Sequence, residues 1–274
     1  MAKLAQRIAT RDETCDQAIY RMMCYIHSTL KWRQVGYVGD DLPEVRFHLY
    51  ADADFAGDPS KKSTSGLHLA VAGPLTYFPI QGQSKRQGCV SHSTPEADMV
   101  AADFAVQREG IPILDLWDVL CPGHGELVFH EDNEAMIRVL RTGKSPTTRA
   151  LARAHGVAVA ALKEFFDMSH VELVYTKSSR QAADVYTKGF TNRDQWCHAT
   201  TLIGVYDLDS FNVGVSVAMS SAEADETIPQ EVERRSLPAL SHPRLRRCGV
   251  PRSRGVFPAR AGCVCLATMR LLYL

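Results

Sequence analysis

The segment Val45-Arg-Phe-His-Leu-Tyr-Ala-Asp-Ala53 alternates apolar residues with polar and aromatic ones. Its odd-numbered positions carry Val, Phe, Leu, Ala and Ala, and its even-numbered positions carry Arg, His, Tyr and Asp. Successive side chains of a β-strand point to opposite faces, so this period of two predicts a strand with one apolar face. The strand closes at Asp52, and the turn residues Gly57-Asp-Pro-Ser60 follow it.

The segments after this strand predict an α/β domain. Two further strands, Gly66–Val71 and Leu75–Ile80, flank Gly73-Pro74 and read as a hairpin that extends an antiparallel meander. The remaining elements are expected as a helix from Pro95 to near Gly110, a strand at Leu127–His130, a helix at Ala135–Leu140, a helical segment at Thr147–Phe166, a strand at Val171–Tyr175 and a final helix at Gln181–Lys188. This order predicts a five-stranded mixed sheet flanked by helices.

Composition predicts a soluble globular protein with one main domain. The chain has 274 residues, of which 45% are hydrophobic and 23% charged, with a formal net charge of zero. We expect an N-terminal amphipathic helix at Cys15–Leu30 within residues 1–43, which also hold a linker, then a domain at 44–211 and a disordered Arg/Pro-rich tail at 212–274. The tail holds nine arginines, no lysine and two acidic residues from Glu231 onward, which leaves the rest of the chain acidic.

The cellular compartment expected from the sequence is intracellular, cytoplasmic or nuclear. The eight cysteines have scattered spacing, which is typical of reduced thiols, and no secretory leader is recognised. The apolar run near the end is interrupted by Arg270 and is too short to span a bilayer, so no membrane association is expected.

Four aspartates stand at the ends of predicted elements, and their placement points to metal chemistry. They are Asp52, Asp98, Asp132 and Asp184. Any one of them alone is most often a helix cap or a turn residue. Carboxylates that converge from separate elements, however, suit Mg²⁺, and two ions about 4 Å apart can clamp the attacking water and the leaving oxygen of a phosphodiester.

Five short motifs resemble the ribonuclease H domain of copia-type retrotransposon polyproteins, in order and at similar distances. The motifs are Tyr50-Ala-Asp-Ala-Asp-Phe-Ala-Gly57, Ser63-Thr-Ser-Gly66, Ser93-Thr-Pro-Glu-Ala-Asp98, His130-Glu-Asp-Asn133 and Gln181-Ala-Ala-Asp-Val-Tyr-Thr-Lys188. The resemblance runs from about Asp16 to Trp196, and the helix that opens it resembles the end of the reverse-transcriptase region of these polyproteins.

The resemblance implies a ribonuclease H-like fold that hydrolyses the RNA strand of an RNA–DNA hybrid with two Mg²⁺ ions, or Mn²⁺ in their place. It assigns Asp52, Asp98, Asp132 and Asp184 as catalytic metal ligands. Asp54 is the alternative to Asp52, since the two would face the same side of a continuing strand. Partners implied in the same way are the hybrid and the reverse-transcriptase and integrase domains of the Pol polyprotein.

The chain departs from the family pattern at Asp98, where a glutamate is usual. Glu96 lies two residues earlier, and residues two apart on a helix do not share a face, so it does not simply substitute. A catalytically decayed ribonuclease H-like domain, with residual nucleic-acid binding or none, is therefore the alternative function. A third hypothesis is that the chain is another nuclease or an integrase of the same fold.

Candidate nucleic-acid contacts are few. Lys61, Lys62, Lys85 and Arg86 can meet phosphates or be solvated surface charges, and Asn133 can contact a nucleotide or cap the following helix. His155 is expected in a helical segment as an ordinary surface or core residue, and His170 in the loop before the fifth strand. Neither is assigned a proton-shuttle role.

Overall fold

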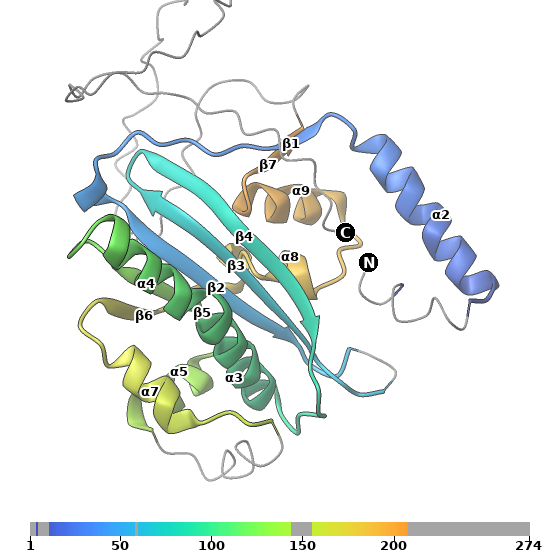
Figure 1. Ribbon diagram of the computed structural model, residues 1–274. Helices are drawn as coiled ribbons and strands as arrows, with labels where there is room; N and C mark the ends of the chain where they lie inside the picture. Colours follow the sequence, from blue (N-terminus) through green and yellow to red (C-terminus); the bar gives the residue numbers. More distant parts are fainter. Residues whose placement is uncertain (1–3, 5–10, 58–59, 144–154, 208–274) are drawn as a thin grey trace, which may run out of the picture. The chain divides into compact units, whose positions relative to one another are not determined.

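The computed structural model describes Leu4 and residues 11–57, 60–143 and 155–207. Within these residues, five strands form one mixed sheet, called here the large sheet, in the order β4-β3-β2-β5-β6. The strands are β2 (Arg46–Asp54), β3 (Thr64–Gly73), β4 (Thr76–Arg86), β5 (Leu127–Glu131) and β6 (Val171–Tyr175). β2, β3 and β4 pair antiparallel, while β5 and β6 run parallel to β2. The expected five-stranded mixed sheet is confirmed (Figure 1).

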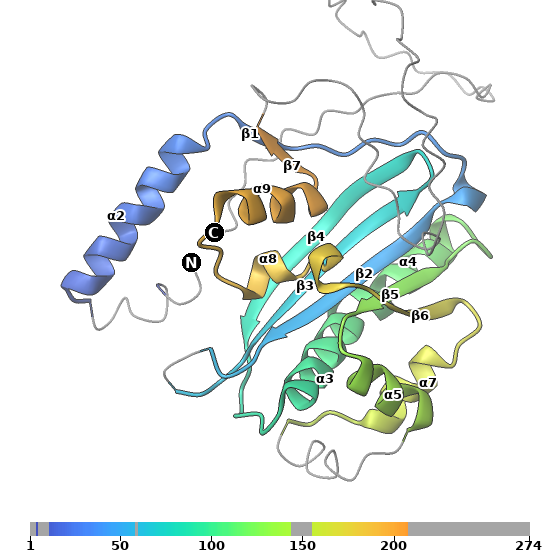
Figure 2. The same ribbon diagram turned by 180° about the vertical axis from the view of Figure 1, so that it is seen from behind.

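Helices cover both faces of the large sheet (Figures 1 and 2). One face carries α3 (Thr94–Ala105), α4 (Ile111–Leu120), α5 (Glu134–Thr142) and α7 (Val159–Phe166). The other face carries the single-turn helix α8 (Asp184–Thr187), which contacts β2, β3 and β4, and α9 (Arg193–Leu202) next to it. The helices flanking the sheet are therefore as the sequence predicts.

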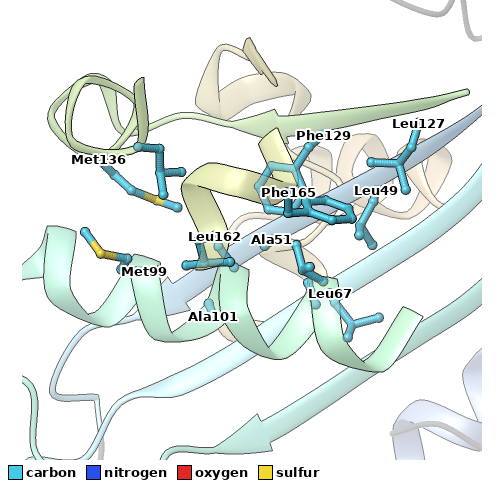
Figure 3. Close-up of a cluster of buried hydrophobic side chains, with 14 of the residues drawn as sticks. Leu49, Ala51, Leu67, Met99, Ala101, Leu127, Phe129, Met136, Leu162 and Phe165 are labelled. Atoms are coloured by element: carbon cyan, nitrogen blue, oxygen red, sulfur yellow. The ribbon is translucent and has the colours of Figure 1, made fainter. Parts of the chain in front are cut away.

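The main core lies between the large sheet and the helices on the face that carries α3. The apolar positions of β2, among them Leu49 and Ala51, are completely buried there, and Phe129 of β5 lies beside them. Figure 3 shows Met99 and Ala101 of α3 and Leu162 of α7 pointing into the same cluster. Burying a Leu or Phe side chain contributes about 1.5–3 kcal/mol, so this face supplies most of the driving force that holds α3 against the strands.

The opposite face of the sheet is buried too, but it is polar and aromatic. His48 Nδ1 lies 2.8 Å from His130 Nε2, and His130 Nδ1 lies 2.8 Å from Thr176 Oγ1. The ring of Tyr50 stacks on His130 with centroids 4.0 Å apart. Burial lowers the pKa of His48 to about 4, so the imidazoles are neutral and satisfy one another as buried polar groups must.

The helix expected to end near Gly110 instead continues to Leu120. A π-helical turn, Val106–Gly110, joins α3 directly to α4. Pro112 in the first turn of α4 has no N–H to donate, so one helical hydrogen bond is missing directly after the π-turn. A β-carbon at Gly110 would lie 3.3 Å from Leu49 Cδ2, so the glycine marks close packing on the sheet.

Two other helix predictions need correction. Within the described part of Thr147–Phe166, the helix begins only at Val159, since His155–Ala158 forms a turn in which Gly156 has a φ of +72°; residues 147–154 lie outside the described residues. The helix expected at Gln181–Lys188 is reduced to α8, preceded by the 3-10 turn Ser178–Arg180. Gln181 is extended because its Nε2 donates to the carbonyl of Ala51.

The N-terminal helix is confirmed as α2 (Glu13–Ser28), capped by Asp12. Of its apolar residues, Met23 is 54% exposed and Ile26 38%. Short elements that the sequence did not reveal are the 3-10 turn Leu42–Glu44 and the strands β1 (Trp32–Gln34) and β7 (Val205–Asp207), which pair with each other. The domain boundaries stay a prediction, and the β1–β7 pair is a contact across the first of them.

None of the helices in the described ranges is both long enough and apolar enough to cross a bilayer.

Candidate metal centre

Three of the four predicted aspartates converge at one end of the large sheet. Among the described residues, Asp52, Asp132 and Asp184 form a cluster, the acidic triad, in which one carboxylate oxygen from each lies within 4.8 Å of the others. Asp52 stands near the end of β2, Asp132 directly follows β5, and Asp184 opens α8. Because β2 and β5 are parallel and Tyr50 pairs with His130, Asp52 and Asp132 leave neighbouring strands side by side.

A glycine lets the third member reach the other two. Gly66 is the partner of Asp52 across the β2–β3 pair. A β-carbon at Gly66 would lie 2.6 Å from Thr187 Cγ2 and 2.9 Å from the carbonyl oxygen of Ala183, so only glycine leaves room for α8 at this place. The hydroxyl of Thr187 donates to Asp52 Oδ2, which ties α8 to β2 directly.

The fourth predicted aspartate, Asp98, lies close to the acidic triad but is not part of it. It lies in the second turn of α3 and is only 3% exposed. Asn133 Nδ2 donates a hydrogen bond of 2.7 Å to Asp98 Oδ2. Asp98, Asp52 and Asp132 all line one open pocket of about 520 Å³. The structure thus brings all four predicted residues to one end of the sheet, with Asp98 at the edge of the cluster.

Asp52 and Asp54, the two alternatives for the first metal ligand, lie in different surroundings. Asp52 belongs to the acidic triad and is 5% exposed. Asp54 also lines the pocket, but its carboxylate lies over Gly57, where it occupies the place that a β-carbon of that residue would take. The side chain of Asp54 therefore packs against the turn that follows β2.

Burial and the repulsion of neighbouring carboxylates raise the pKa values of Asp98, Asp132 and Asp184. Burial raises the pKa of Asp98 to about 7 against the lowering effect of its bond from Asn133, and the charges of Asp52 and Asp132 add to the rise. Burial also raises the pKa of Asp184 to about 6 and shifts the pKa of Asp132 upward. Carboxylates held together in this way favour any cation, a proton or a metal ion, that neutralises them.

A fifth acid, Glu131, was missed by the sequence reasoning. It is 1% exposed, and its Oε1 accepts a hydrogen bond from the backbone N–H of Asn133. Its Oε2 is buried with no hydrogen-bond partner in the described part of the chain. Burial, followed by the charge of Asp98, raises the pKa of Glu131 well above its usual range. The signal was present, since Glu131 continues the inward, apolar alternation of Leu127 and Phe129.

A lysine was also missed, although it lies inside one of the recognised motifs. Lys188 Nζ is 2.7 Å from Asp184 Oδ1 and 3.5 Å from Asp52 Oδ1. Its side chain is 39% exposed and lines the same pocket as Asp52 and Asp132. A cation therefore already lies against two members of the acidic triad.

Solved structures of ribonuclease H domains resemble this chain. The LC11-RNase H1 isolated from compost by a metagenomic approach is 14% identical over 52% of this chain and 92% of its own, with a TM-score of 0.34. Its complex with an RNA/DNA hybrid gives 18% identity, 52% and 94% coverage, and a TM-score of 0.36. The ribonuclease H domain of prototype foamy virus is 15% identical over 58% and 91%, with a TM-score of 0.31. No family model and no curated protein sequence matches.

The candidate nucleic-acid residues lie in different settings. Asn133 caps α5 by accepting from the N–H groups of Ala135 and Met136, so the capping interpretation is confirmed. Lys61 is exposed and has a φ of +59°, Lys62 donates to the carbonyl of Gly88, and Arg86 Nη2 donates to Ser60 at 2.5 Å. Lys85 lies 4.9 Å over the ring of Phe104. Their contact with nucleic acid stays a prediction.

The two histidines have structural settings outside the pocket. His155 lies in the turn before α7, not in a helix, and its Nε2 is 3.3 Å from Glu96 Oε1, with both side chains buried. This pair fastens the first turn of α3, just before Asp98. His170 is exposed and directly precedes β6, as expected.

Proposed function

We propose that this chain is a metal-dependent nuclease that hydrolyses the RNA strand of an RNA–DNA hybrid, as the ribonuclease H domain of a copia-type Pol polyprotein. The observation that carries the proposal is the convergence of Asp52, Asp132 and Asp184 within 4.8 Å of one another, at an open pocket that Asp52, Asp132 and Asp98 line. The order and spacing of the motifs that hold these residues support the choice of substrate.

The donor set fits Mg²⁺ or Mn²⁺. The acidic triad offers carboxylate oxygens, the hard ligands that Mg²⁺ prefers, and the open pocket leaves room for the waters that Mg²⁺ keeps. When bound, a pair of such ions supplies an activated water and neutralises the charge on the leaving oxygen. We assign Asp52, Asp98, Asp132 and Asp184 as the residues that hold them.

The residues around the triad prepare it for this role. Thr187 fixes one oxygen of Asp52, and Asn133 fixes Oδ2 of Asp98, so Oδ1 of Asp98 is left for a cation or a water. Because these partners are set before substrate arrives, little reorganisation is needed at the moment of reaction. The restraint on Asp98 is needed most, since its carboxylate is one methylene shorter than the usual glutamate.

Hybrid binding is assigned to the basic residues at the same end of the sheet. Lys85 and Arg86 pair with Ser65 and Thr64, immediately next to the Gly66 that faces Asp52. With Lys61 and Lys62 they can contact phosphates, while the RNA strand is selected by its 2′-hydroxyls and the wide minor groove. The reverse-transcriptase and integrase domains of the polyprotein are the proposed covalent or assembly partners.

One observation favours a second candidate, a decayed domain. Asp98 stands where the family has glutamate, and it lies outside the group of oxygens within 4.8 Å. Its pKa of about 7 further reduces its charge at neutral pH. A domain with this defect would keep the fold and lose cleavage.

A cleavage assay on an end-labelled hybrid separates the two candidates. The full chain, with Mg²⁺ or Mn²⁺, is compared with Asp132→Asn, Asp98→Glu and the control Asp167→Asn, whose carboxylate pairs with Lys163 away from the pocket. An active nuclease yields 5′-phosphate products with the wild type and the control, and not with Asp132→Asn. Equal cleavage by the wild type and Asp132→Asn would refute the assigned site. Cleavage by Asp98→Glu alone would establish the decayed domain.

A further inference from the structure

Lys188 is the basic member of an otherwise acidic pocket. Its ammonium lies 2.7 Å from Asp184 Oδ1 and 3.5 Å from Asp52 Oδ1, so it contacts two carboxylates of the acidic triad at once. Among the described residues that line the pocket, Lys188 is the one cation, and the acidic residues are Asp52, Asp54, Asp98, Asp132 and Glu134. In a partly desolvated site, this single positive charge has a large effect on the carboxylates next to it.

Helix α8 places Lys188 next to Asp184. Asp184 and Lys188 are four residues apart at the two ends of α8, and the N–H of Lys188 donates to the carbonyl of Asp184 at 2.8 Å. Side chains at this spacing are neighbours on a helical turn. The side chain of Lys188 is also 39% exposed, so its ammonium has an open route to solvent that requires no unfolding of α8.

The carboxylates that Lys188 contacts are those that a divalent ion would need. Asp52 has Oδ2 engaged by the Thr187 hydroxyl and Oδ1 near Lys188, and Asp184 has Oδ1 bound by Lys188. An ion held by the triad at ordinary ligand distances would therefore compete with the ammonium for the same oxygens. An ammonium that stayed in contact with these oxygens would be repelled by the bound ion, whose charge is larger and which would lie close to it.

We propose that Lys188 is the resident cation of the metal centre: its ammonium neutralises Asp52 and Asp184 in the metal-free protein and moves off them when a divalent ion binds. The inference rests on the proposed function in assuming that the triad binds such an ion. Lys188 is a positioning residue here. It stabilises the metal-free site and makes metal binding weaker than four carboxylates alone would give.

The first test is a Mn²⁺ titration of the full metal-free chain by calorimetry. Lys188→Met removes the charge and keeps most of the apolar stem, whereas Lys188→Arg keeps the charge. Lys163→Met is the matched control, because Lys163 also pairs with an aspartate four residues away, outside the pocket. We expect Lys188→Met to bind Mn²⁺ roughly tenfold more tightly than the wild type, with Lys188→Arg and Lys163→Met close to the wild type.

The second test is thermal unfolding with chelator and with saturating Mn²⁺. Lys188→Met should melt below the wild type in chelator, since its carboxylates repel one another, and the gap should close or reverse with Mn²⁺. Equal or weaker Mn²⁺ binding by Lys188→Met, or a gap that Mn²⁺ leaves unchanged, would overturn the inference while leaving the nuclease proposal standing. Absence of Mn²⁺ binding in every variant would overturn both. Neither test uses hybrid cleavage, so an inactive chain can still confirm the role of Lys188.

Discussion

Thr187 packs over Gly66 so closely that a β-carbon on Gly66 would lie 2.6 Å from Thr187 Cγ2. This contact sets the distance between α8 and β3, and therefore how near Asp184 comes to Asp52. The shape of the metal centre depends on the absence of a side chain at Gly66, which pairs with Asp52 across β2 and β3.

Replacing Gly66 should displace α8 and so move Asp184 away from Asp52. Gly66→Ala forces α8 outward, and such overpacking typically costs about 1–3 kcal/mol. We expect a lower free energy of unfolding by urea and weaker Mn²⁺ binding together. Gly88→Ala is the control, because a β-carbon there would meet no atom within 4 Å. Unchanged Mn²⁺ affinity in Gly66→Ala would show that α8 does not need this close approach.

Asp52 and Asp54 should differ sharply when each is made neutral. Asp52→Asn removes a member of the acidic triad, whereas Asp54→Asn changes a carboxylate that lies over Gly57. We expect Asp52→Asn to weaken Mn²⁺ binding by at least roughly 10- to 100-fold, a loss seen even for groups that merely support a ligand. Asp54→Asn should change it far less. Calorimetry on both variants measures this, and the reverse order would make Asp54 the first ligand.

The stability of the metal-free protein should fall as the pH rises from about 4 to about 7. Burial raises the pKa of Asp98 to about 7, so the folded chain keeps a proton that the unfolded chain releases at lower pH. Below the pKa of the unfolded chain, Asp98 is protonated in both states and does not change the free energy of unfolding with pH. Between the two pKa values only the folded state keeps the proton, so the free energy of unfolding falls as the pH rises. Each pKa unit corresponds to about 1.4 kcal/mol.

Asp98→Asn isolates this contribution. Its amide can still accept the hydrogen bond from Asn133, so the packing is preserved. Urea unfolding in chelator across this pH range should give a flatter slope for Asp98→Asn than for the wild type. Identical slopes would mean that the pKa of Asp98 is the same in the folded and unfolded states.

Glu131→Gln should stabilise the metal-free protein at pH 8. The pKa of Glu131 is raised well above its usual range, chiefly by burial, and its Oε2 has no hydrogen-bond partner among the described residues. A neutral amide of similar shape removes a buried acid, and a gain on the order of 1–3 kcal/mol is typical of relieving such a group. The gain should shrink as the pH falls toward the pKa of an unfolded glutamate, because the raised pKa of Glu131 costs stability only where the unfolded chain is ionised. A loss of stability at pH 8, measured by urea unfolding, would point to a partner for the charged form.

The Glu96–His155 pair should behave as one unit. Oε1 of Glu96 and Nε2 of His155 are buried 3.3 Å apart, and no hydrogen-bond partner for either occurs in the described ranges. His155→Ala leaves Glu96 without this contact, at a cost of about 1–3 kcal/mol. In a cycle with Glu96→Ala and the double variant, the double variant should be less destabilised than the sum of the two single ones. Additive losses would show that the two side chains act independently.

The local pattern of the sequence predicted the five strands of the large sheet and their order along the chain, but not β1 and β7. The alternation along Val45–Ala53 predicted β2, and the turn at Gly73-Pro74 predicted the β3–β4 hairpin, because both depend on a residue and its immediate neighbours. The helix end expected near Gly110 was wrong, because the helix continues through this residue to Leu120. Gly110 remains helical since it packs against Leu49 and Phe165, which are distant in the chain.

For the site, the sequence supplied the four aspartates and the tertiary structure decided how they meet. Motif spacing marked Asp52, Asp98, Asp132 and Asp184, but only the parallel pairing of β2 with β5 and the gap above Gly66 bring three of them within 4.8 Å. The parts that Glu131 and Lys188 play there depend on burial and on charges contributed by other elements. Electrostatic interactions act across space, so residues that are remote in sequence set them, and no local pattern records them.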